Sequence, residues 1–538
     1  MSSFEETAKA SERLSPEEII ALFHPEESVK DKGYSVMMSN TEENRFLRQT
    51  NVTTTDMSEE DLGQLFNAYA MQDESSTVTD YIESTLRPVI SNSIHCCAPT
   101  MIGHMTSSLP YYIRPLAKLV TTLHANNVKV ETGKASTFLE KETLAMLHHC
   151  FYEHDKEFYE EYAAARDTCL GVVCSGGTIA NNTALWIARN KCLPAKGDFL
   201  GCDKDGLAAG LIEHGYKKAV VIGSAVMHYS MMKAADILGI GTNGLRKVPF
   251  DPDYTVNIPA MREMIEECRA QNIAIIALVG VAGGTETGSV DNLGAIAALA
   301  EEFGIHFHVD GAWGGPSIFS SYGKKLLSGI EKADTITIDG HKQLYTPMGC
   351  GICLLKDPNQ IDTVKKTANY IIRKQSHDLG KFSMEGSRPA VSMFLHANLR
   401  ILGHDGLAFL MDRSMNLTRY MVASLRTSRH FEIMMNPMTN ILLYRYVPEK
   451  DGLRDLMEKG ESLTAEQNAA IDAINVSIQN LQKHRGRTFT SRTTIFSHAH
   501  DQMVVCMRVV IANPLTTEAD VDMVIQDQID IAKEIIAE

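Results

Sequence analysis

The fold can be read outward from two neighbouring stretches, IHFHVDGAWGG at residues 305–315 and TITIDGHK at residues 335–342. Each begins with a short run of β-branched or alternating residues, which is typical of a buried strand. The first run ends in an acid, Asp310, and the second ends, after a histidine, in an amine, Lys342. Either half alone could be a buried strand followed by a surface aspartate or lysine. The two together are less easily explained in this way.

An acid and a lysine at the ends of neighbouring strands are what pyridoxal 5′-phosphate (PLP) requires of a protein. The lysine binds the aldehyde of this cofactor covalently. The carboxylate keeps the pyridinium nitrogen protonated, because a nearby opposite charge favours the charged form, and the ring can then take up electrons. The sequence therefore predicts a PLP site at Asp310 and Lys342, and no metal site.

These motifs resemble those of the group II PLP-dependent decarboxylases, which act on glutamate, aspartate, tyrosine, histidine and aromatic amino acids. The His-Lys pair of that family matches His341-Lys342, and its Asp-x-Ala motif matches residues 310–312. Matching motifs run from about residue 95 to about residue 525. The resemblance implies that Lys342 and His341 contact the cofactor and that Ala312 lies under the pyridine ring, where a larger side chain would not fit.

The composition is that of a globular protein with more than one domain. With 538 residues the chain exceeds a single core, and its 44% apolar and 22% charged residues are ordinary values. A net charge of −16 argues against nucleic acid or an anionic membrane as a partner. No run of 18 apolar residues is present, so no membrane span is predicted.

The cysteines indicate a reducing compartment. The eleven cysteines have no regular spacing, and the first residues lack the basic and apolar regions of a targeting sequence, so we expect reduced thiols and a cytoplasmic location. Cys350 and Cys353 form a CxxC, but it lies in an apolar run without a second pair. We interpret them as core cysteines rather than as a zinc or redox site.

Strand-like and helix-like stretches alternate between about residues 165 and 360, which implies a mostly parallel sheet covered on both faces. Ligands bind at the carboxyl ends of the strands in such sheets, where Asp310 and Lys342 fall. The resemblance implies an α/β protein of PLP fold type I, the aspartate aminotransferase-like fold. The strands that we predict here are 170–174, 219–223, 273–281, 305–309, 335–338 and 351–355, with helices at 179–190, 259–270 and 291–303.

We divide the chain into three parts. These are an N-terminal helical segment at 1–150, a large PLP-binding domain at 151–404 and a small C-terminal α+β domain at 405–538, with strands at 440–446 and 503–511. The acidic residues 1–80 show no chemistry and are interpreted as a packing segment or a dimer arm. Members of the resembled family are dimers whose active sites use both subunits, so a homodimer is expected by analogy.

A glycine turn follows the first predicted strand of the sheet. Ser175-Gly176-Gly177-Thr178 opens a helix, and a helix N-terminus with nearby glycines favours a bound anion. A strand-to-helix turn without a ligand is the alternative explanation of the same residues. The resemblance implies that Gly177 and Thr178 contact the cofactor phosphate, with Asn181 as a further candidate.

Two residues after the next strands are assigned by the same resemblance. His228 would stack on the face of the pyridine ring opposite Ala312, although a histidine at a helix start is also commonly a cap. Thr285, in a Gly-Thr-rich loop, would contact the cofactor ring. Asp291 is instead expected to cap the helix that begins at residues 292–293.

Two residues far apart in the chain are predicted to bind the substrate. Arg508 lies inside the apolar strand 503–511, where a buried guanidinium needs a partner, and it matches the arginine that binds a substrate carboxylate in the resembled family. His104 lies in a segment that contributes to the substrate pocket in that family, often the pocket of the neighbouring subunit. A helix-terminal histidine without such a role is the alternative.

A polar stretch at 361–388 is expected to form a loop over the site. The equivalent loop in the resembled family carries a tyrosine, which matches Tyr370. Residues 386–388 resemble the Gly-Ser-Arg turn of the family, but Pro389 stands where a second arginine is usual, which leaves the local contacts open.

The parts together predict decarboxylation of an amino acid. Tyr370, with His228, would return a proton to Cα, and Arg508 would hold the α-carboxylate. The substrate that we expect is L-aspartate, giving β-alanine, with L-glutamate, giving 4-aminobutanoate, as the alternative. His104 is the candidate for the second carboxylate. Another fold type I PLP enzyme, such as a lyase or an aminotransferase, and a non-catalytic scaffold with a decayed site are the competing classes.

Overall fold

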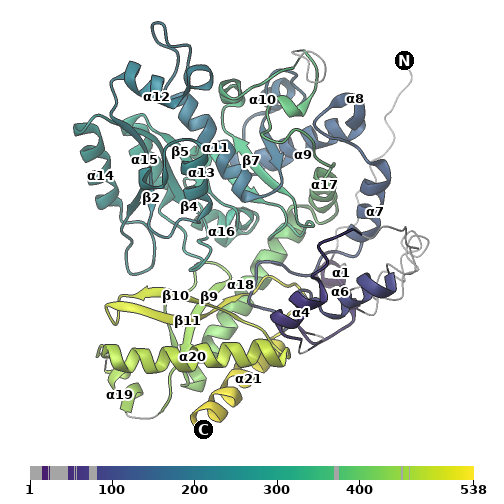
Figure 1. Cartoon of the computed structure of the whole chain (residues 1–538), viewed down its shortest axis with the longest axis vertical. Helices are drawn as coiled ribbons and strands as arrows, with labels where there is room; N and C mark the ends of the chain where they lie inside the picture. Colours follow the sequence, from purple (N-terminus) through teal and green to yellow (C-terminus); the bar gives the residue numbers. More distant parts are fainter. Residues whose placement is uncertain are drawn as a thin grey trace.

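The computed structural model describes residues 15–21, 23–24, 46–53, 55, 57–71, 82–368, 375–449, 452–459 and 461–537. Tyr370 therefore lies outside the described residues. A large α/β part, drawn in teal in Figure 1, stands above a smaller part, drawn in light green and yellow, that carries the C-terminus.

A seven-stranded sheet forms the centre of the large part, in the order β1-β7-β6-β5-β4-β2-β3. Its strands run parallel except β7, which is antiparallel to both of its neighbours. Every residue of β4 is buried, because both faces of the sheet are covered. The strands are β1 Gly171–Cys174, β2 Lys218–Ser224, β3 Leu245–Val248, β4 Ile273–Val281, β5 His306–Asp310, β6 Thr335–Asp339 and β7 Gly351–Leu355.

Helices cover the two faces of this sheet with two separate apolar cores. On one face α11 (Gly177–Cys192) and α13 (Ser230–Ile237) pack against strand residues such as Ile276 and Val279. On the other face α9 (Ala135–Tyr152), α14 (Ile258–Ala270) and α15 (Leu293–Phe303) pack against Ile275 and Leu278. Neighbouring residues of β4 thus point to opposite cores, except Ile276 and Ala277, which share one core where the pairing of β2 with β4 shifts register.

The smaller part is built on a four-stranded antiparallel sheet, in the order β10-β11-β9-β8. Three long helices, α18, α20 and α21, pack with this sheet, and α18 also contacts the large part. The strands are β8 Phe431–Ile433, β9 Ile441–Tyr446, β10 Ser491–Ser497 and β11 Gln502–Val510, and the helices are α18 Gly403–Ser428, α20 Ala465–Arg485 and α21 Glu518–Ala537. The domain boundary at 404/405 falls at the start of α18 and stays a prediction.

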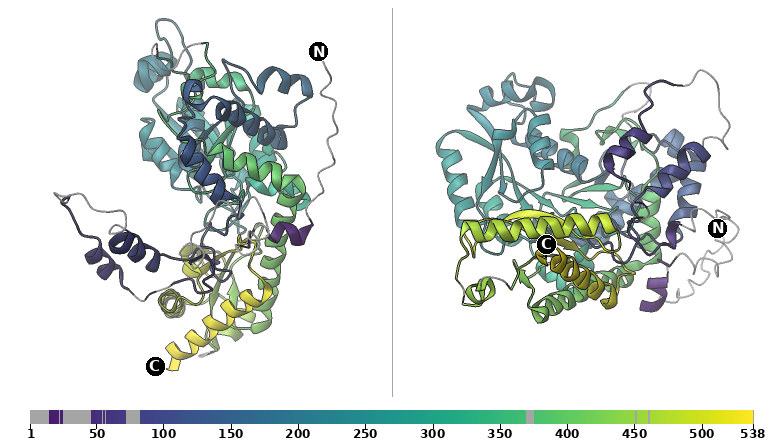
Figure 2. Two further views of the ribbon diagram at one scale, coloured as in Figure 1. Left: turned by 90° about the vertical axis from the view of Figure 1, so that its right-hand side faces the viewer. Right: turned by 60° about the horizontal axis from the view of Figure 1, so that its bottom comes forward.

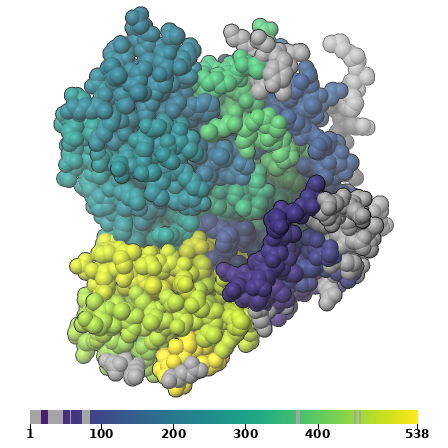
Figure 3. Space-filling model, viewed as in Figure 1, coloured from purple at the N-terminus to yellow at the C-terminus, as the bar shows by residue number. Residues whose placement is uncertain are grey.

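The N-terminal segment lies beside both parts, and Figure 3 shows it, in purple, on the surface next to their junction. The stretch with α4 stands away from the body of the molecule (Figure 2, left). The remaining helices are α1 Pro16–Ala21, α4 Glu59–Leu65, α6 Arg87–Ser91, α7 Ile113–Leu123, α8 Val130–Gly133, α10 Lys156–Tyr162, α12 Cys202–His214, α16 Ser321–Leu326, α17 Ser392–Ile401 and α19 Leu453–Glu458.

The expected alternation of strands and helices is confirmed, and every strand predicted between 170 and 355 is present. All eleven cysteines are free thiols, and Cys350 and Cys353 are buried. Within the described ranges, no helix is long and apolar enough to cross a membrane.

The expectation for Asp291 is wrong. Asn292 caps α15, because its side chain accepts a hydrogen bond from the Ala295 N–H. The buried Asp291 carboxylate instead accepts from the backbone N–H groups of Val256 and Val281, at 2.7 and 2.8 Å, and ties a loop to the end of β4.

Candidate active site

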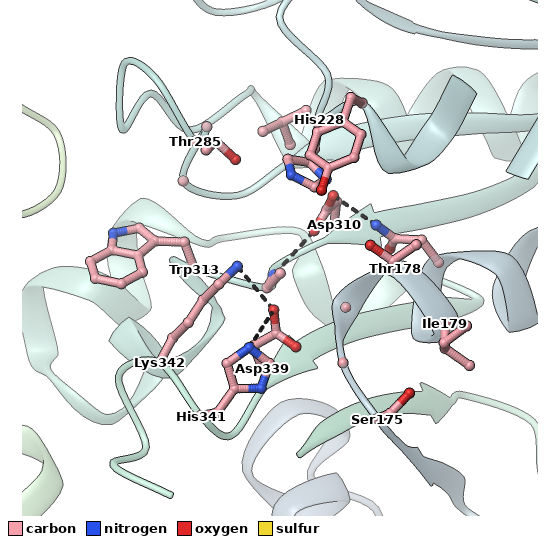
Figure 4. A pocket seen from close by; sticks show the side chains of 18 of the residues that line it. Ser175, Thr178, Ile179, His228, Thr285, Asp310, Trp313, Asp339, His341 and Lys342 are labelled. Atoms are coloured by element: carbon pink, nitrogen blue, oxygen red, sulfur yellow. Dashed lines mark hydrogen bonds and ion pairs between the residues drawn. The ribbon is translucent and has the colours of Figure 1, made fainter. Parts of the chain in front are cut away.

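A cavity of about 350 Å³ opens at the carboxyl ends of the central strands, beside the N-terminus of α11 (Figure 4). It gathers eight of the residues predicted from the sequence: Gly177, Thr178, His228, Thr285, Asp310, Ala312, His341 and Lys342. These residues come from separate turns after β1, β2, β4, β5 and β6. The topology brings them together because the strand ends of a parallel sheet meet at one edge.

Asp310, the last residue of β5, is buried and held from two sides. Asn181 of α11 donates from Nδ2 to Asp310 Oδ2 at 3.0 Å, and the Ala312 N–H donates to Oδ1 at 3.2 Å. Asn181 Nδ2 also donates to Ser230 Oγ at 2.9 Å. Asn181, proposed as a further phosphate contact, thus directs its amide to Asp310 and fixes the carboxylate in the cavity.

A buried histidine extends this support. His308 Nε2 lies 3.0 Å from Asn181 Oδ1. Burial lowers the pKa of His308 to about 4, although Asp310 opposes the shift, so the ring is neutral at pH 7. The Nε2–H can then donate to Asn181, which turns the amide of Asn181 toward Asp310.

Lys342 lies three residues beyond β6, and its amine points back to the end of that strand. Nζ is 2.9 Å from Asp339 Oδ2, and Asp339 is buried (Figure 4). His341 Nδ1 lies 2.9 Å from the Cys350 carbonyl oxygen, and His341 Nε2 lies 3.8 Å from Asp339. The sequence reasoning missed Asp339, although an acid that ends a buried strand was the very signal that singled out Asp310.

The N-terminus of α11 forms a second wall of the cavity. A side chain at Gly177 would place its Cβ only 2.8 Å from Asp339 Oδ2, so the close approach of helix and carboxylate requires glycine. The first N–H groups of a helix have no carbonyl partner within the helix and carry a partial positive charge. Gly177 and Thr178 therefore lie where an anion such as a phosphate is stabilised.

His228 occupies the far side of the cavity from Lys342 in Figure 4. Its Nδ1 lies 2.9 Å from Ser230 Oγ, and its ring packs against Tyr229 with centroids 4.2 Å apart. Burial, followed by the charge of Lys342, lowers the pKa of His228, and Asp310 opposes this. The ring is therefore largely neutral at pH 7 and suited to stacking.

Arg508, on β11 of the smaller part, is not among the residues that line the cavity, but it contacts Thr285, which is. Its Nε donates to the Thr285 carbonyl oxygen at 2.7 Å, and Nη1 lies 3.4 Å from both the Gly103 carbonyl oxygen and Ser491 Oγ. Nη2 is buried and has no hydrogen-bond partner among the residues that the structure describes. Burial lowers the pKa of Arg508 to about 10, so it stays charged at pH 7 with one donor group unused.

His104 lies outside the cavity lining and has an exposed side chain, with Nδ1 3.2 Å from Thr106 Oγ1. Its pKa is lowered by partial burial and then by the charges of Arg508 and Lys342. The structure thus brings His104 near the two predicted cationic groups, but at the rim.

These groups fit PLP. A lysine amine, a fixed carboxylate, a neutral histidine and a helix N-terminus line one cavity, and together they match the aldehyde, the ring nitrogen, the ring face and the phosphate of that cofactor. When bound, the cofactor supplies an electron sink for a bond broken at Cα. With the mostly parallel sheet, these features define a PLP-dependent enzyme of fold type I.

The comparisons with known proteins narrow this class. Residues 60–447 match the family model described as the pyridoxal-dependent decarboxylase conserved domain, so the chain belongs to that family and is a PLP-dependent amino-acid decarboxylase. It is 39% identical to an aspartate 1-decarboxylase of Aliivibrio fischeri, over 91% of this chain and 89% of that protein.

Two further proteins show the breadth of the family. The chain is 28% identical to an L-2,4-diaminobutyrate decarboxylase of Rhizobium meliloti, over 67% of this chain and 68% of that protein. The crystal structure of mouse CSAD superposes with a TM-score of 0.78 at 23% identity, covering 96% of this chain and 98% of that one. The last likeness shows that the fold is shared.

Proposed function

We propose that the protein removes the α-carboxyl group of L-aspartate and releases β-alanine. The observation that carries this proposal is the buried Nη2 of Arg508, a charged donor without a partner among the described residues, on a side chain that contacts Thr285 of the cavity wall. The similarity to an aspartate 1-decarboxylase over nine-tenths of the chain supports the same substrate. L-Glutamate is the second candidate, because its two carboxylates make the same demands.

Each predicted residue has a role in this proposal. Lys342 anchors the cofactor, and Asp310 keeps the ring nitrogen protonated. His228 and Ala312 hold the plane of the ring from opposite faces. Arg508 binds the α-carboxylate and directs the bond that breaks. Gly177 and Thr178 bind the phosphate, with Thr285 and His341 beside the cofactor, and Tyr370 protonates Cα.

The second carboxylate of the substrate is assigned to His104. Because its pKa is lowered, the imidazole offers a hydrogen bond rather than a full charge at pH 7. Such an imidazole can donate a hydrogen bond to a carboxylate. It gives the positive charge of a diaminobutyrate side chain no counter-ion.

The test compares kcat/KM for CO2 release from aspartate, glutamate, 2,4-diaminobutyrate and tyrosine. We expect kcat/KM to be highest for aspartate and lower for tyrosine by at least about 10²-fold, because a site built for a polar group discriminates strongly against substrates that lack it. His104→Gln should reduce the ratio of kcat/KM for aspartate to kcat/KM for tyrosine. Arg508→Lys should lower kcat/KM for all four substrates. A preference for glutamate, diaminobutyrate or tyrosine would replace the assigned substrate.

We also propose that the protein acts as a cytoplasmic homodimer. The free thiols support the compartment. Around α4 the N-terminal segment exposes apolar side chains that a partner subunit would cover: Leu65, Phe66, Tyr69 and Met71. Light scattering of the purified protein should give twice the chain mass of 59.4 kDa, and a monomer at micromolar concentration would exclude the dimer.

A further inference from the structure

The cavity contains two carboxylates, and the structure holds them differently. Both oxygens of Asp310 accept hydrogen bonds, from Asn181 and from the backbone of Ala312. Asp339 Oδ2 has the Lys342 amine at 2.9 Å and His341 Nε2 at 3.8 Å, and Oδ1 is buried without a hydrogen-bond donor among the described residues. A buried carboxylate oxygen without a donor is poorly stabilised as an anion, and it is a free position for a proton.

Asp339 also lies where an incoming phosphate has to be accommodated. Its Oδ2 approaches the first residue of α11 so closely that a Cβ at Gly177 would be 2.8 Å away. The same helix N-terminus is the predicted phosphate site. A phosphate placed there would meet an ionised carboxylate, and like charges that share a site disfavour the charged form of the carboxyl group.

The other titratable groups near Asp339 make no hydrogen bond to it among the described residues. His341 Nε2 is 3.8 Å away, and Asp339 also acts on the pKa of His228, which burial lowers. The nearby thiols Cys174 and Cys350 are buried, and burial raises the pKa of both. Lys342 is therefore the cationic side chain in direct contact with Asp339.

We propose that Asp339 is the base that takes the Lys342 proton when the cofactor is loaded. The ammonium proton passes from Nζ to the carboxylate, so an N–H bond breaks and an O–H bond forms, and the pair stays neutral overall. The free amine then condenses with the cofactor aldehyde, whose oxygen leaves as water with the two remaining amine protons. The neutral Asp339 carboxyl no longer repels the phosphate and can donate to it.

This inference rests on the proposed function, in that Lys342 is taken as the cofactor lysine. The transfer within the pair needs no base from solvent. Loading of the wild-type protein should therefore depend on pH less than the reaction of PLP with a free lysine derivative does. In Asp339→Asn the amine must lose its proton to solvent, and loading should accelerate as pH rises, by up to ~10-fold per pH unit while the ammonium predominates.

The experiment follows the absorbance change when PLP is added to cofactor-free protein between pH 6 and pH 8. The readout is the ratio of the loading rates of wild type and Asp339→Asn, which cancels the ionisation of PLP itself. We expect this ratio to fall as pH rises. A purely structural role of Asp339 would shift all rates by one factor, so a ratio independent of pH would overturn the proposal.

Asp334→Asn is the matched control. Asp334 precedes the same strand, β6, at its opposite end, and it pairs with Lys191 at 3.0 Å, far from the cavity. Its loading rates should follow those of the wild type at every pH.

Two further readouts separate the possible failures. If Asp339→Asn does not fold, the wild-type protein alone tests the proposal. Its rate of PLP loading is then compared with the rate at which PLP reacts with Nα-acetyl-lysine. The same pH dependence of both rates would exclude an internal base. Peptide mapping of the borohydride-reduced protein identifies the anchoring lysine. An adduct on another lysine would overturn the site assignment, whereas an adduct on Lys342 with a ratio independent of pH would overturn only the role of Asp339.

Discussion

Lys342 and Lys141 are both largely withdrawn from water, but their amines meet opposite surroundings. Lys342 has a carboxylate 2.9 Å away. Lys141, on α9, donates to the Ala165 carbonyl oxygen at 2.6 Å and lies 3.1 Å from His377 Nδ1, while Arg166 donates to the other ring nitrogen of His377 at 3.2 Å. Burial lowers the pKa of Lys141 to about 8, and nearby cations add to the effect.

The hydrogen bonds around His377 disfavour the charged form of Lys141. A neutral imidazole has one donor and one acceptor nitrogen, and Arg166 is always a donor. In the neutral ring Nε2 must therefore accept from Arg166, so Nδ1 carries the proton and cannot accept a hydrogen bond from a charged Lys141 ammonium. Lys141, whose pKa is lowered by burial, does not line the cavity. A perturbed pKa thus marks burial, and a site needs the cavity, the acid and the helix N-terminus as well.

Removing the Lys342 amine is the strongest test of this comparison. Lys342→Ala should lose the borohydride-reducible PLP adduct and slow decarboxylation by on the order of 10⁴-fold or more, because a covalent catalytic residue is removed. Lys141→Ala should retain the adduct and most of the activity. Mass spectrometry of the reduced proteins provides the measurement. A reducible adduct that survives in Lys342→Ala and maps to Lys141 would invert the comparison.

The second test concerns the transfer of a proton to Cα of the substrate. This step is proposed for Tyr370 at the Lys342 site and has no counterpart at Lys141. Tyr370→Phe should still bind substrate but slow protonation of Cα by about 10²–10⁴-fold, the usual contribution of a positioned general acid. Part of the product should then be diverted to an aldehyde. Quantifying amine and aldehyde by chromatography provides the measurement, and unchanged turnover with clean amine would remove Tyr370 from the mechanism.

The smallest expected effect concerns the stability cost of Lys141. Its folded-state pKa of about 8 lies below the value of an exposed lysine, so between these values the unfolded chain binds a proton that the folded protein lacks. Stability should therefore rise with pH through this window. At pH 7 Lys141→Met should unfold at a higher urea concentration than the wild type. We expect its free energy of unfolding to be larger by about 1–2 kcal/mol, once the hydrogen bonds lost with the lysine are subtracted. The difference should vanish near pH 10.5, and a gain of equal size at pH 7 and pH 10.5 would show that the charge of Lys141 is not the cause.

The large sheet and most of the cavity could be predicted because their signals are local. A buried strand that ends in a functional residue can be read directly from residues 305–310 and 335–342. The strands that were missed have weaker patterns. β3 carries charged residues within a four-residue edge strand, and the first residues of β10 are largely exposed, so neither forms an apolar run.

The missed or altered site residues depend on contacts that no local pattern records. Asn181 was noticed as part of the helix after the glycine turn, but its partner Asp310 is 129 positions away. Asp339 stood inside the quoted stretch, yet its meaning depends on the position of Gly177 across the cavity. Asp291 resembled a cap because it precedes a helix, whereas the fold uses it to bind two distant backbone N–H groups.

The bond from Arg508 to the Thr285 carbonyl oxygen has a consequence for the order of events during synthesis. The proposed cofactor residues end at Lys342 and the strands of the large sheet end at residue 355, whereas Arg508 is made near the end of the chain. At roughly 5–20 residues per second, the intervening stretch takes on the order of ten to thirty seconds to translate. During that interval a nascent chain can assemble the cofactor pocket but lacks the arginine for the substrate carboxylate, so competence for the cofactor precedes competence for the substrate.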